Sequence, residues 1–385
     1  MKSILKVAVI GGGTMGLDIA ALLARQGMPV TVKEITTATA DTAQKKFSGR
    51  VESWLTRDKI TDMQASQMLA LFSATTDYES IEDADLAIEA IFENREIKQR
   101  VFAELEAHLA ENAILASNTS SIPIALLASG AMHPERFAGF HFFNPPTRMP
   151  LIEVIPAAGT AADTVESLRV FAIETLQKTP ITVKDRPGFL VNVLLCAYLV
   201  PAIRAMERTT VLPEQIDACA RAFGWPMGPF FLLDMLGIDV AAEVLRILCE
   251  AYGERFADSG LVSRMVQSGR LGNKAGKGFY GENGFEELRQ EIFPNRVPGD
   301  ADAVFKAMMF ALVDEASLAI QDDIASAEDI ETGCLLGLGF PQKKGGPLHY
   351  ADEVGVAGIV QSLGEDASLL LKSKAAKGET FFESW

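Results

Sequence analysis

Short apolar runs alternate with amphipathic stretches over the first 185 residues of the chain. Apolar runs bounded by polar or Gly/Pro residues are typical of buried strands, and apolar positions three and four residues apart are typical of helices. Strands that alternate with helices favour an α/β, doubly wound sheet, which binds its ligands at the carboxyl ends of its strands. The pattern predicts strands at residues 6–10, 30–34, 85–91, 113–116, 138–143, 151–156 and 181–184. It also predicts three helices: one that follows the first strand and ends near residue 25, one at 96–109 and one at about 163–177.

Residues 38–72 interrupt this alternation. Ala43, Phe47 and Val51 follow one helical face, Ala65 and Met68 begin a second, and the segment around Thr61 supplies a break and a helix cap. This spacing predicts a helical hairpin arm over residues 38–72. Such an arm can simply pack on the domain, but one of this length between adjacent strands often reaches over a ligand.

After residue 187 the pattern is helical only, and it shows weak internal similarity. The same spacing of a proline, an aspartate and a glycine occurs twice, as Pro229, Asp234 and Gly237 and as Pro347, Asp352 and Gly355. Two Gly/Pro turns can resemble each other by chance, but the similarity favours a duplicated all-α domain joined near residues 281–301. We therefore expect three domains, at residues 1–185, 186–295 and 296–385.

Composition narrows the class of protein. The chain has 35 basic and 51 acidic residues, a net charge of -16, which argues against nucleic acid as the main partner. Its most apolar stretch, residues 190–203, contains Asn192, Tyr198 and Pro201, so we expect a buried helix and no membrane span. The four cysteines are widely spaced, and the first residues do not read as a secretion signal. These features predict a cytoplasmic protein with neither disulfides nor a metal site.

A glycine loop follows the first predicted strand. Gly11, Gly13 and Gly16 form G-x-G-x-x-G where a Rossmann-type fold binds a dinucleotide, with Thr14 and Met15 opening the helix. The first glycine allows a tight turn, the second lets the backbone approach a pyrophosphate, and the third lets helix and strand pack closely. Glu34 ends the second strand, and no arginine follows it. A carboxylate there can bind ribose hydroxyls and repel a 2′-phosphate, so the sequence favours NAD over NADP, although FAD uses the same fingerprint.

A second site candidate is a histidine between two predicted strands. His141 lies in the second half of the strand at 138–143, and Glu153 lies near the start of the strand at 151–156. A carboxylate beside a histidine can fix its tautomer and stabilise its charged form, which would make His141 a general base. A buried structural histidine is the alternative. Ser120, Asn144 and Asn192 follow or begin neighbouring elements, and together with a dinucleotide fold they indicate alcohol oxidation.

With these motifs the chain resembles the L-3-hydroxyacyl-CoA dehydrogenases over essentially its whole length. The C-terminal copy, with GLGFP at 337–341, resembles the dehydrogenase half of the multifunctional fatty-acid oxidation enzymes, without their hydratase module. The other segments that carry the resemblance are GGGTMGLDI at 11–19, EAIFEN at 89–94, SNTSSI at 117–122, GFHFFNP at 139–145, LIEV at 151–154, DRPGFLVN at 185–192, GWPMGPFFLLDMLG at 224–237 and KGFY at 277–280.

The resemblance implies an activity and a set of roles. The activity is NAD-dependent oxidation of (S)-3-hydroxyacyl-CoA to 3-oxoacyl-CoA, a step of fatty-acid β-oxidation and lipid metabolism. The catalytic residues would be His141 as general base, Glu153, Ser120 and Asn192. The cofactor would contact Gly11, Gly13, Thr14, Met15, Gly16, Glu34, Glu93, Lys98, Ser120 and Asn144. The substrate would contact Ser120 and Asn192, and Lys45 and Lys46 on the arm would hold the anionic end of CoA. Val193 stands where the family commonly has arginine.

The sequence is compatible with other functions as well. A dehydrogenase of a free 3-hydroxy acid or sugar acid shares the fold and the His/Glu pair, and a binding protein could keep the fold without catalysis. Because single-copy relatives dimerise through their helical domains, we expect residues 296–385 to pack on 186–295 as an internal pseudo-dimer within a monomer. The resemblance also leaves room for association with a hydratase or thiolase, or for membership of a larger enzyme.

Overall fold

The computed structural model describes residues 2–257, 260–281 and 284–382. The chain divides into two compact units, Met1–Arg186 and Pro187–Trp385. The boundary falls one residue after the predicted end of the first domain. Apart from Arg186, the residues of both expected helical copies, 186–295 and 296–385, fall in the second unit, and their division into two domains stays a prediction.

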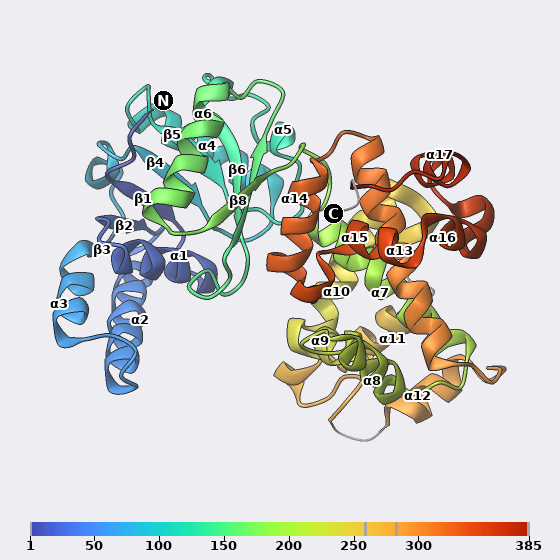
Figure 1. Ribbon diagram of the computed structural model, residues 1–385. Helices are drawn as coiled ribbons and strands as arrows, with labels where there is room; N and C mark the ends of the chain where they lie inside the picture. Colours follow the sequence, from blue (N-terminus) through green and yellow to red (C-terminus); the bar gives the residue numbers. More distant parts are fainter. Residues whose placement is uncertain (1, 258–259, 282–283, 383–385) are drawn as a thin grey trace. The chain divides into compact units, whose positions relative to one another are not determined.

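The first unit is built on one eight-stranded sheet with the strand order β3-β2-β1-β4-β5-β6-β7-β8 (Figure 1). Neighbouring strands are parallel except for β6 and β7, which are antiparallel. The mostly parallel sheet confirms the predicted α/β class. The strands are β1 (Val7–Ile10), β2 (Val30–Lys33), β3 (Phe72–Thr75), β4 (Leu86–Glu89), β5 (Ile114–Ser117), β6 (Phe137–Phe142), β7 (Leu151–Pro156) and β8 (Thr179–Thr182).

Helices cover both faces of this sheet. Alternate residues of a strand point to opposite faces, and Val7 and Val9 of β1 belong to the core that α1 completes. On the other face the ring of Phe137 lies 4.4 Å from that of Phe102 in α4. Burial on both faces explains why these strands read as continuous apolar runs. The helices of this unit are α1 (Thr14–Arg25), α2 (Thr37–Thr56), α3 (Asp62–Leu71), α4 (Arg95–His108), α5 (Ile124–Leu127) and α6 (Ala162–Val170), with a π-helical turn at Phe171–Thr175.

The predicted arm is present as α2 and α3, which extend away from the rest of the first unit (Figure 1). Thr36 and Thr61 cap the two helices, each accepting a hydrogen bond from the amide three residues later. One part of the prediction is wrong. Phe72 does not end a helix but begins β3, where its ring stacks on Phe47 at 3.7 Å. The last strand is also displaced, since β8 begins two residues before the predicted 181–184.

The second unit is helical throughout its regular elements, and its longest helices, α7 and α13, pack against each other. None of the described helices combines the length and apolar character that a membrane crossing needs. The helices are α7 (Val191–Arg208), α8 (Pro213–Phe223), α9 (Pro229–Leu236), α10 (Ile238–Tyr252), α11 (Leu261–Gln267), α12 (Phe285–Ile292), α13 (Ala301–Gln321), α14 (Ala327–Gly333), α15 (Pro347–Val354), α16 (Val356–Leu363) and α17 (Leu369–Lys377).

Two acidic side chains hold corresponding turns in each half of this unit, and Asp217, Asp234 and Glu331 among the four are buried. In the first half, Asp217 accepts hydrogen bonds from the amides of Phe230 and Phe231 at the start of α9, both at 3.0 Å. Asp234 accepts from the amides of Phe279 and Tyr280, both at 2.9 Å.

The second half repeats this arrangement. Glu331 accepts from the amides of Leu348 and His349 at the start of α15, both at 2.9 Å. Asp352 accepts from the amides of Phe381 and Phe382 at 2.8 and 3.0 Å. A chance likeness of two turns would not reproduce two pairs of amide contacts. We therefore propose that residues 296–385 repeat 186–295, with α13 packed on α7 where a second subunit would otherwise lie.

Candidate active site

The glycine loop joins β1 to α1, and the structure shows why glycine suits positions 11, 13 and 16. Gly11 has φ +102°, a conformation that favours glycine. A Cβ on Gly16 would lie 1.9 Å from the carbonyl oxygen of Gly11, so helix and loop pack too closely for any side chain. A Cβ on Gly13 would meet nothing within 4 Å. The backbone is therefore exposed at the start of α1, where the unpaired amides of Thr14 and Met15 can bind phosphate.

Glu34 directly follows β2 and contacts this loop. Its Oε1 accepts a hydrogen bond from the amide of Gly12 at 2.5 Å, and its Oε2 accepts one from Ile35 at 3.3 Å. A Cβ on Gly12 would lie 2.8 Å from Oε1, which explains the third adjacent glycine. The carboxylate expected at the adenosine ribose is thus held beside the phosphate-binding turn. These groups fit a dinucleotide.

A cavity of about 500 Å³ adjoins the glycine loop on the side of the arm. Lys46 and Arg50 of α2 line it, and Arg50 pairs with Asp18 of α1. Lys45 is exposed and is not among the lining residues. Lys46 is exposed too, so the two lysines differ in that Lys46 lines the cavity, and a contact of Lys45 with CoA stays a prediction. The structure adds Arg50, whose position one helical turn after Lys46 was the available signal. The other lining residues are Gly13, Thr14, Leu17, Ser53 and Trp54.

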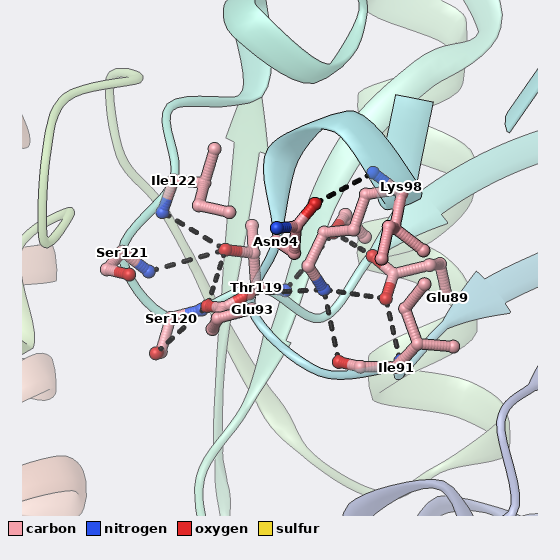
Figure 2. A network of polar contacts seen from close by, with 11 residues as sticks. Glu89, Ile91, Glu93, Asn94, Lys98, Thr119, Ser120, Ser121 and Ile122 are labelled. Atoms are coloured by element: carbon pink, nitrogen blue, oxygen red, sulfur yellow. Dashed lines mark hydrogen bonds and ion pairs between the residues drawn. The ribbon is translucent and has the colours of Figure 1, made fainter. Parts of the chain in front are cut away.

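The loops after β4 and β5 are joined by a polar network (Figure 2). Glu93 Oε1 accepts hydrogen bonds from the Thr119 hydroxyl at 2.7 Å and from the amide and hydroxyl of Ser120 at 2.8 and 3.3 Å. Nζ of Lys98, in α4, lies 3.1 Å from Oε2 of Glu93 and 2.6 Å from Oε1 of Glu89. The structure thus brings together Glu93, Lys98 and Ser120, three residues that the resemblance assigned to the cofactor.

Electrostatics in this network favour the charged form of Glu93. Burial alone would raise the pKa of its carboxyl group, but the Lys98 ammonium and the hydrogen bonds from Ser120 and Thr119 hold that pKa below its ordinary value. Glu89, which was not among the predicted site residues, is fully buried at the end of β4. Its sequence signal was a charged residue among the apolar residues 86–91 of the predicted strand.

His141 and Glu153 face each other across β6 and β7. They are directly opposed in the antiparallel register, and His141 Nδ1 lies 2.8 Å from Glu153 Oε2. Glu153 is fully buried and His141 is 6% exposed. A proton on Nδ1 that is donated to the carboxylate leaves Nε2 as the basic nitrogen of the neutral ring. This arrangement has the geometry of a general base with its orienting partner.

The loop after β5 reaches the histidine strand through Asn118, whose Oδ1 accepts a hydrogen bond from the amide of Phe142 at 2.9 Å. His141 and Ser120 are therefore held at the same edge of the sheet. Asn144 lies exposed just beyond β6, before a cis bond to Pro145. Asn192 belongs to the other unit, where it is half-buried in the first turn of α7.

A glycine loop that opens a helix, a carboxylate after β2 and a His/Glu pair at the same sheet edge define an NAD-dependent oxidoreductase. Two family models match the chain. The NAD binding domain of 3-hydroxyacyl-CoA dehydrogenase matches residues 6–186, and the C-terminal domain of the same family matches residues 188–282. The chain therefore belongs to the 3-hydroxyacyl-CoA dehydrogenase family, and its cofactor is NAD. The resemblance inferred from the sequence is confirmed.

Solved structures support this assignment. A 3-hydroxybutyryl-CoA dehydrogenase from Escherichia coli is 28% identical, with a TM-score of 0.86 over 98% of this chain and 99% of that chain. The (S)-3-hydroxybutyryl-CoA dehydrogenase PaaH1 from Ralstonia eutropha is 33% identical, with a TM-score of 0.69 over 73% of this chain and 100% of that chain. The dehydrogenase part of a multifunctional enzyme from C. elegans shares the fold at 24% identity and a TM-score of 0.67, over 97% of this chain and 90% of that chain.

Proposed function

We propose that this protein oxidises (S)-3-hydroxyacyl-CoA to 3-oxoacyl-CoA, with His141 as the general base and Glu153 as its partner. The observation that carries the proposal is the buried pair of His141 and Glu153 at the sheet edge where β1 delivers the glycine loop. Such an edge is where open α/β sheets bind their ligands. Two related structures are named as 3-hydroxybutyryl-CoA dehydrogenases, which supports an acyl-CoA substrate.

Each of the site residues has a separate role in the proposed reaction. Nε2 of His141 removes the proton of the 3-hydroxyl group while the C3–H bond breaks. Glu153 stabilises the imidazolium that forms, because its charge is buried beside Nδ1. Ser120 and Asn192 would orient the substrate, and Asn144 and Glu93 would contact the cofactor. NAD, when bound, supplies the acceptor for the hydride that leaves C3.

The charged end of the substrate has a candidate site of its own. CoA carries phosphate groups, and the cavity beside the arm presents Lys46 and Arg50 in a protein whose net charge is -16. Cations grouped in this way in an acidic protein favour a specific anion. We propose that Lys46, with Arg50, contacts phosphate of CoA.

The test is an absorbance assay at 340 nm with NAD and a series of 3-hydroxyacyl-CoA esters that begins with (S)-3-hydroxybutyryl-CoA. We expect turnover of the esters and little or none of free 3-hydroxybutyrate. The reverse result would reject the proposal and favour a dehydrogenase of a free 3-hydroxy acid or sugar acid. Binding of NADH without turnover of any substrate would identify a protein that has kept the fold and lost catalysis.

A further inference from the structure

The ammonium group of Lys98 is buried, and each of its protons has an acceptor. The side chain is 1% exposed. Its Nζ lies 2.6 Å from Glu89 Oε1, 3.1 Å from Glu93 Oε2 and 3.3 Å from the carbonyl oxygen of Ile91 (Figure 2). An ammonium has three N–H donors, so these three contacts use all of them. Lys98 can reach a cofactor directly only by giving up one of these contacts.

Glu89 is the buried counterpart of this cation. Its Oε1 accepts hydrogen bonds from Lys98 and from the amide of Ile91 at 2.7 Å, and its Oε2 accepts one from the hydroxyl of Ser117 at 2.6 Å. Glu89 is fully buried, at the junction of two neighbouring strands. An unpaired charge in such a place is unfavourable, so Glu89 and Lys98 each make the burial of the other tolerable.

Glu93 connects this pair to the site. Its side chain is 38% exposed, so it lies between the buried pair and solvent. Oε2 faces Lys98, and Oε1 accepts hydrogen bonds from Thr119 and from the amide and hydroxyl of Ser120. The carboxylate is therefore fixed at both oxygens, one by a cation from α4 and the other by neutral donors from the loop after β5.

We propose that Glu89 and Lys98 are positioning residues. The buried pair holds the carboxylate of Glu93 against Ser120, and Lys98 acts on NAD through Glu93 rather than by its own contact. The inference rests on the NAD role proposed for Glu93 and Ser120. It adds Glu89 to the residues on which the site depends, and it gives Lys98 an indirect role.

The experiment measures NADH affinity by fluorescence on the full chain, between pH 5 and pH 9 and without acyl-CoA. The variant Glu89→Gln/Lys98→Met removes both buried charges together. We expect its dissociation constant for NADH to rise about tenfold, within the range seen for residues that share one network. The rise should be largest at acid pH, because Glu93 without its cation takes up a proton more readily.

A comparison with Glu93→Gln decides between the indirect and the direct role. If Lys98 acts through Glu93, the triple variant Glu89→Gln/Lys98→Met/Glu93→Gln binds NADH no more weakly than Glu93→Gln alone. If the double change raises the dissociation constant for NADH by the same factor in the Glu93→Gln background as in the unmodified protein, Lys98 contacts the cofactor itself and the inference is wrong. If Glu93→Gln has no effect, the NAD role of Glu93 in the proposed function fails instead.

A second buried ion pair, between Glu106 of α4 and Arg136 directly before β6, is the matched control. Glu106 and Arg136 are 8% and 5% exposed and lie 3.8 Å apart. Glu106→Gln/Arg136→Met should lower the melting temperature and leave the pH dependence of NADH binding unchanged. If the control variant changed the pH dependence of NADH binding as Glu89→Gln/Lys98→Met does, a general loss of stability would explain both results.

A milder variant covers the case in which the double variant does not fold. Lys98→Arg keeps the charge but puts a planar group in a site built for three acceptors. It should weaken NADH binding only when Glu93 is present. Equal weakening in the Glu93→Gln background would overturn the inference.

Discussion

Nδ1 of His141 lies 2.8 Å from Oε2 of Glu153, and the two residues occupy directly opposed positions on β6 and β7. We predict that His141→Ala lowers kcat by about 10²–10⁴-fold, the usual contribution of a positioned base. Glu153→Gln should also lower kcat severely, because it removes the charge that supports the imidazolium.

The check is steady-state kinetics together with NADH titration for both variants. Affinity for NADH should stay near that of the unmodified protein, because neither residue belongs to the glycine loop. Near-normal turnover in His141→Ala would remove His141 from the role of base.

The glycine loop offers two substitutions with opposite expectations for stability. In Gly16→Ala the new Cβ would lie 1.9 Å from the carbonyl oxygen of Gly11, so α1 must shift. We expect a loss of about 1–3 kcal/mol in the free energy of unfolding, as for other overpacked sites.

Gly13→Ala is the matched variant, since its Cβ would meet no protein atom within 4 Å. It should keep the stability of the parent protein and bind NADH more weakly, because the methyl group would occupy the approach to the pyrophosphate. Thermal melts and NADH titration separate the two effects. Unchanged NADH affinity in Gly13→Ala would place the pyrophosphate elsewhere.

Glu34 should set the preference for NAD. Its carboxylate contacts the amide of Gly12 and would repel a 2′-phosphate. We predict that Glu34→Ala weakens NAD binding and narrows the ratio of kcat/KM between NAD and NADP. Kinetics with both cofactors measure this ratio, and an unaltered ratio would argue against contact with the ribose.

Lys46 and Lys45 form a natural pair of test and control. Both side chains are exposed, but Lys46 lines the cavity beside the glycine loop and Lys45 does not. We expect Lys46→Gln to raise KM for 3-hydroxybutyryl-CoA several-fold and to have little effect on a truncated thioester that lacks the nucleotide part of CoA. Lys45→Gln should change neither value. Equal effects of the two substitutions would indicate a general charge effect instead of a site.

Glu331 in the second helical copy should make stability depend on pH. Burial, with a further contribution from Asp352, raises the pKa of its carboxyl group to about 8, despite hydrogen bonds from the amides of His349 and Leu348. The folded protein then keeps a proton that the unfolded chain loses above about pH 4.5. The stability from this group is therefore full at acid pH and is lost as pH rises toward 8.

Glu331→Gln should flatten this dependence. The free energy of unfolding of the unmodified protein should fall by about 2–4 kcal/mol relative to this variant between pH 5 and pH 8, since one pKa unit is worth about 1.4 kcal/mol. Chemical denaturation at several pH values measures the difference, and the exposed Glu365→Gln is the control. Parallel curves for Glu331→Gln and the unmodified protein would contradict the expectation.

The sequence predicted the elements whose physical signal is local. All seven strands that it indicated are present, because strands buried on both faces read as apolar runs. It missed β3, a four-residue strand of which only Phe72 is buried, since a short, partly exposed edge strand has no distinctive pattern. The arm was predicted because its helical spacing and its cap at Thr61 are written in adjacent residues.

In the site, too, the features with a local sequence signal could be predicted and those that depend on distant contacts could not. The glycine loop and the His141–Glu153 pair could be predicted, because each is a short motif with a known geometry. The role of Glu89 could not, because it depends on contacts with Ser117 and Lys98 that lie 28 and nine residues away. The spacing of Arg50 from Lys46 was a local signal, but its place on the cavity depends on how α2 packs beside α1.

The antiparallel pairing of β6 and β7 also limits how this chain can change during evolution. Successive residues of a strand point to opposite faces, so a one-residue slip would turn Glu153 away from His141. We therefore expect homologues to carry no insertion or deletion within residues 151–156. Changes of length in the connection at 147–149 leave the register intact. Homologues that vary in length here should do so between the strands and keep the two side chains paired.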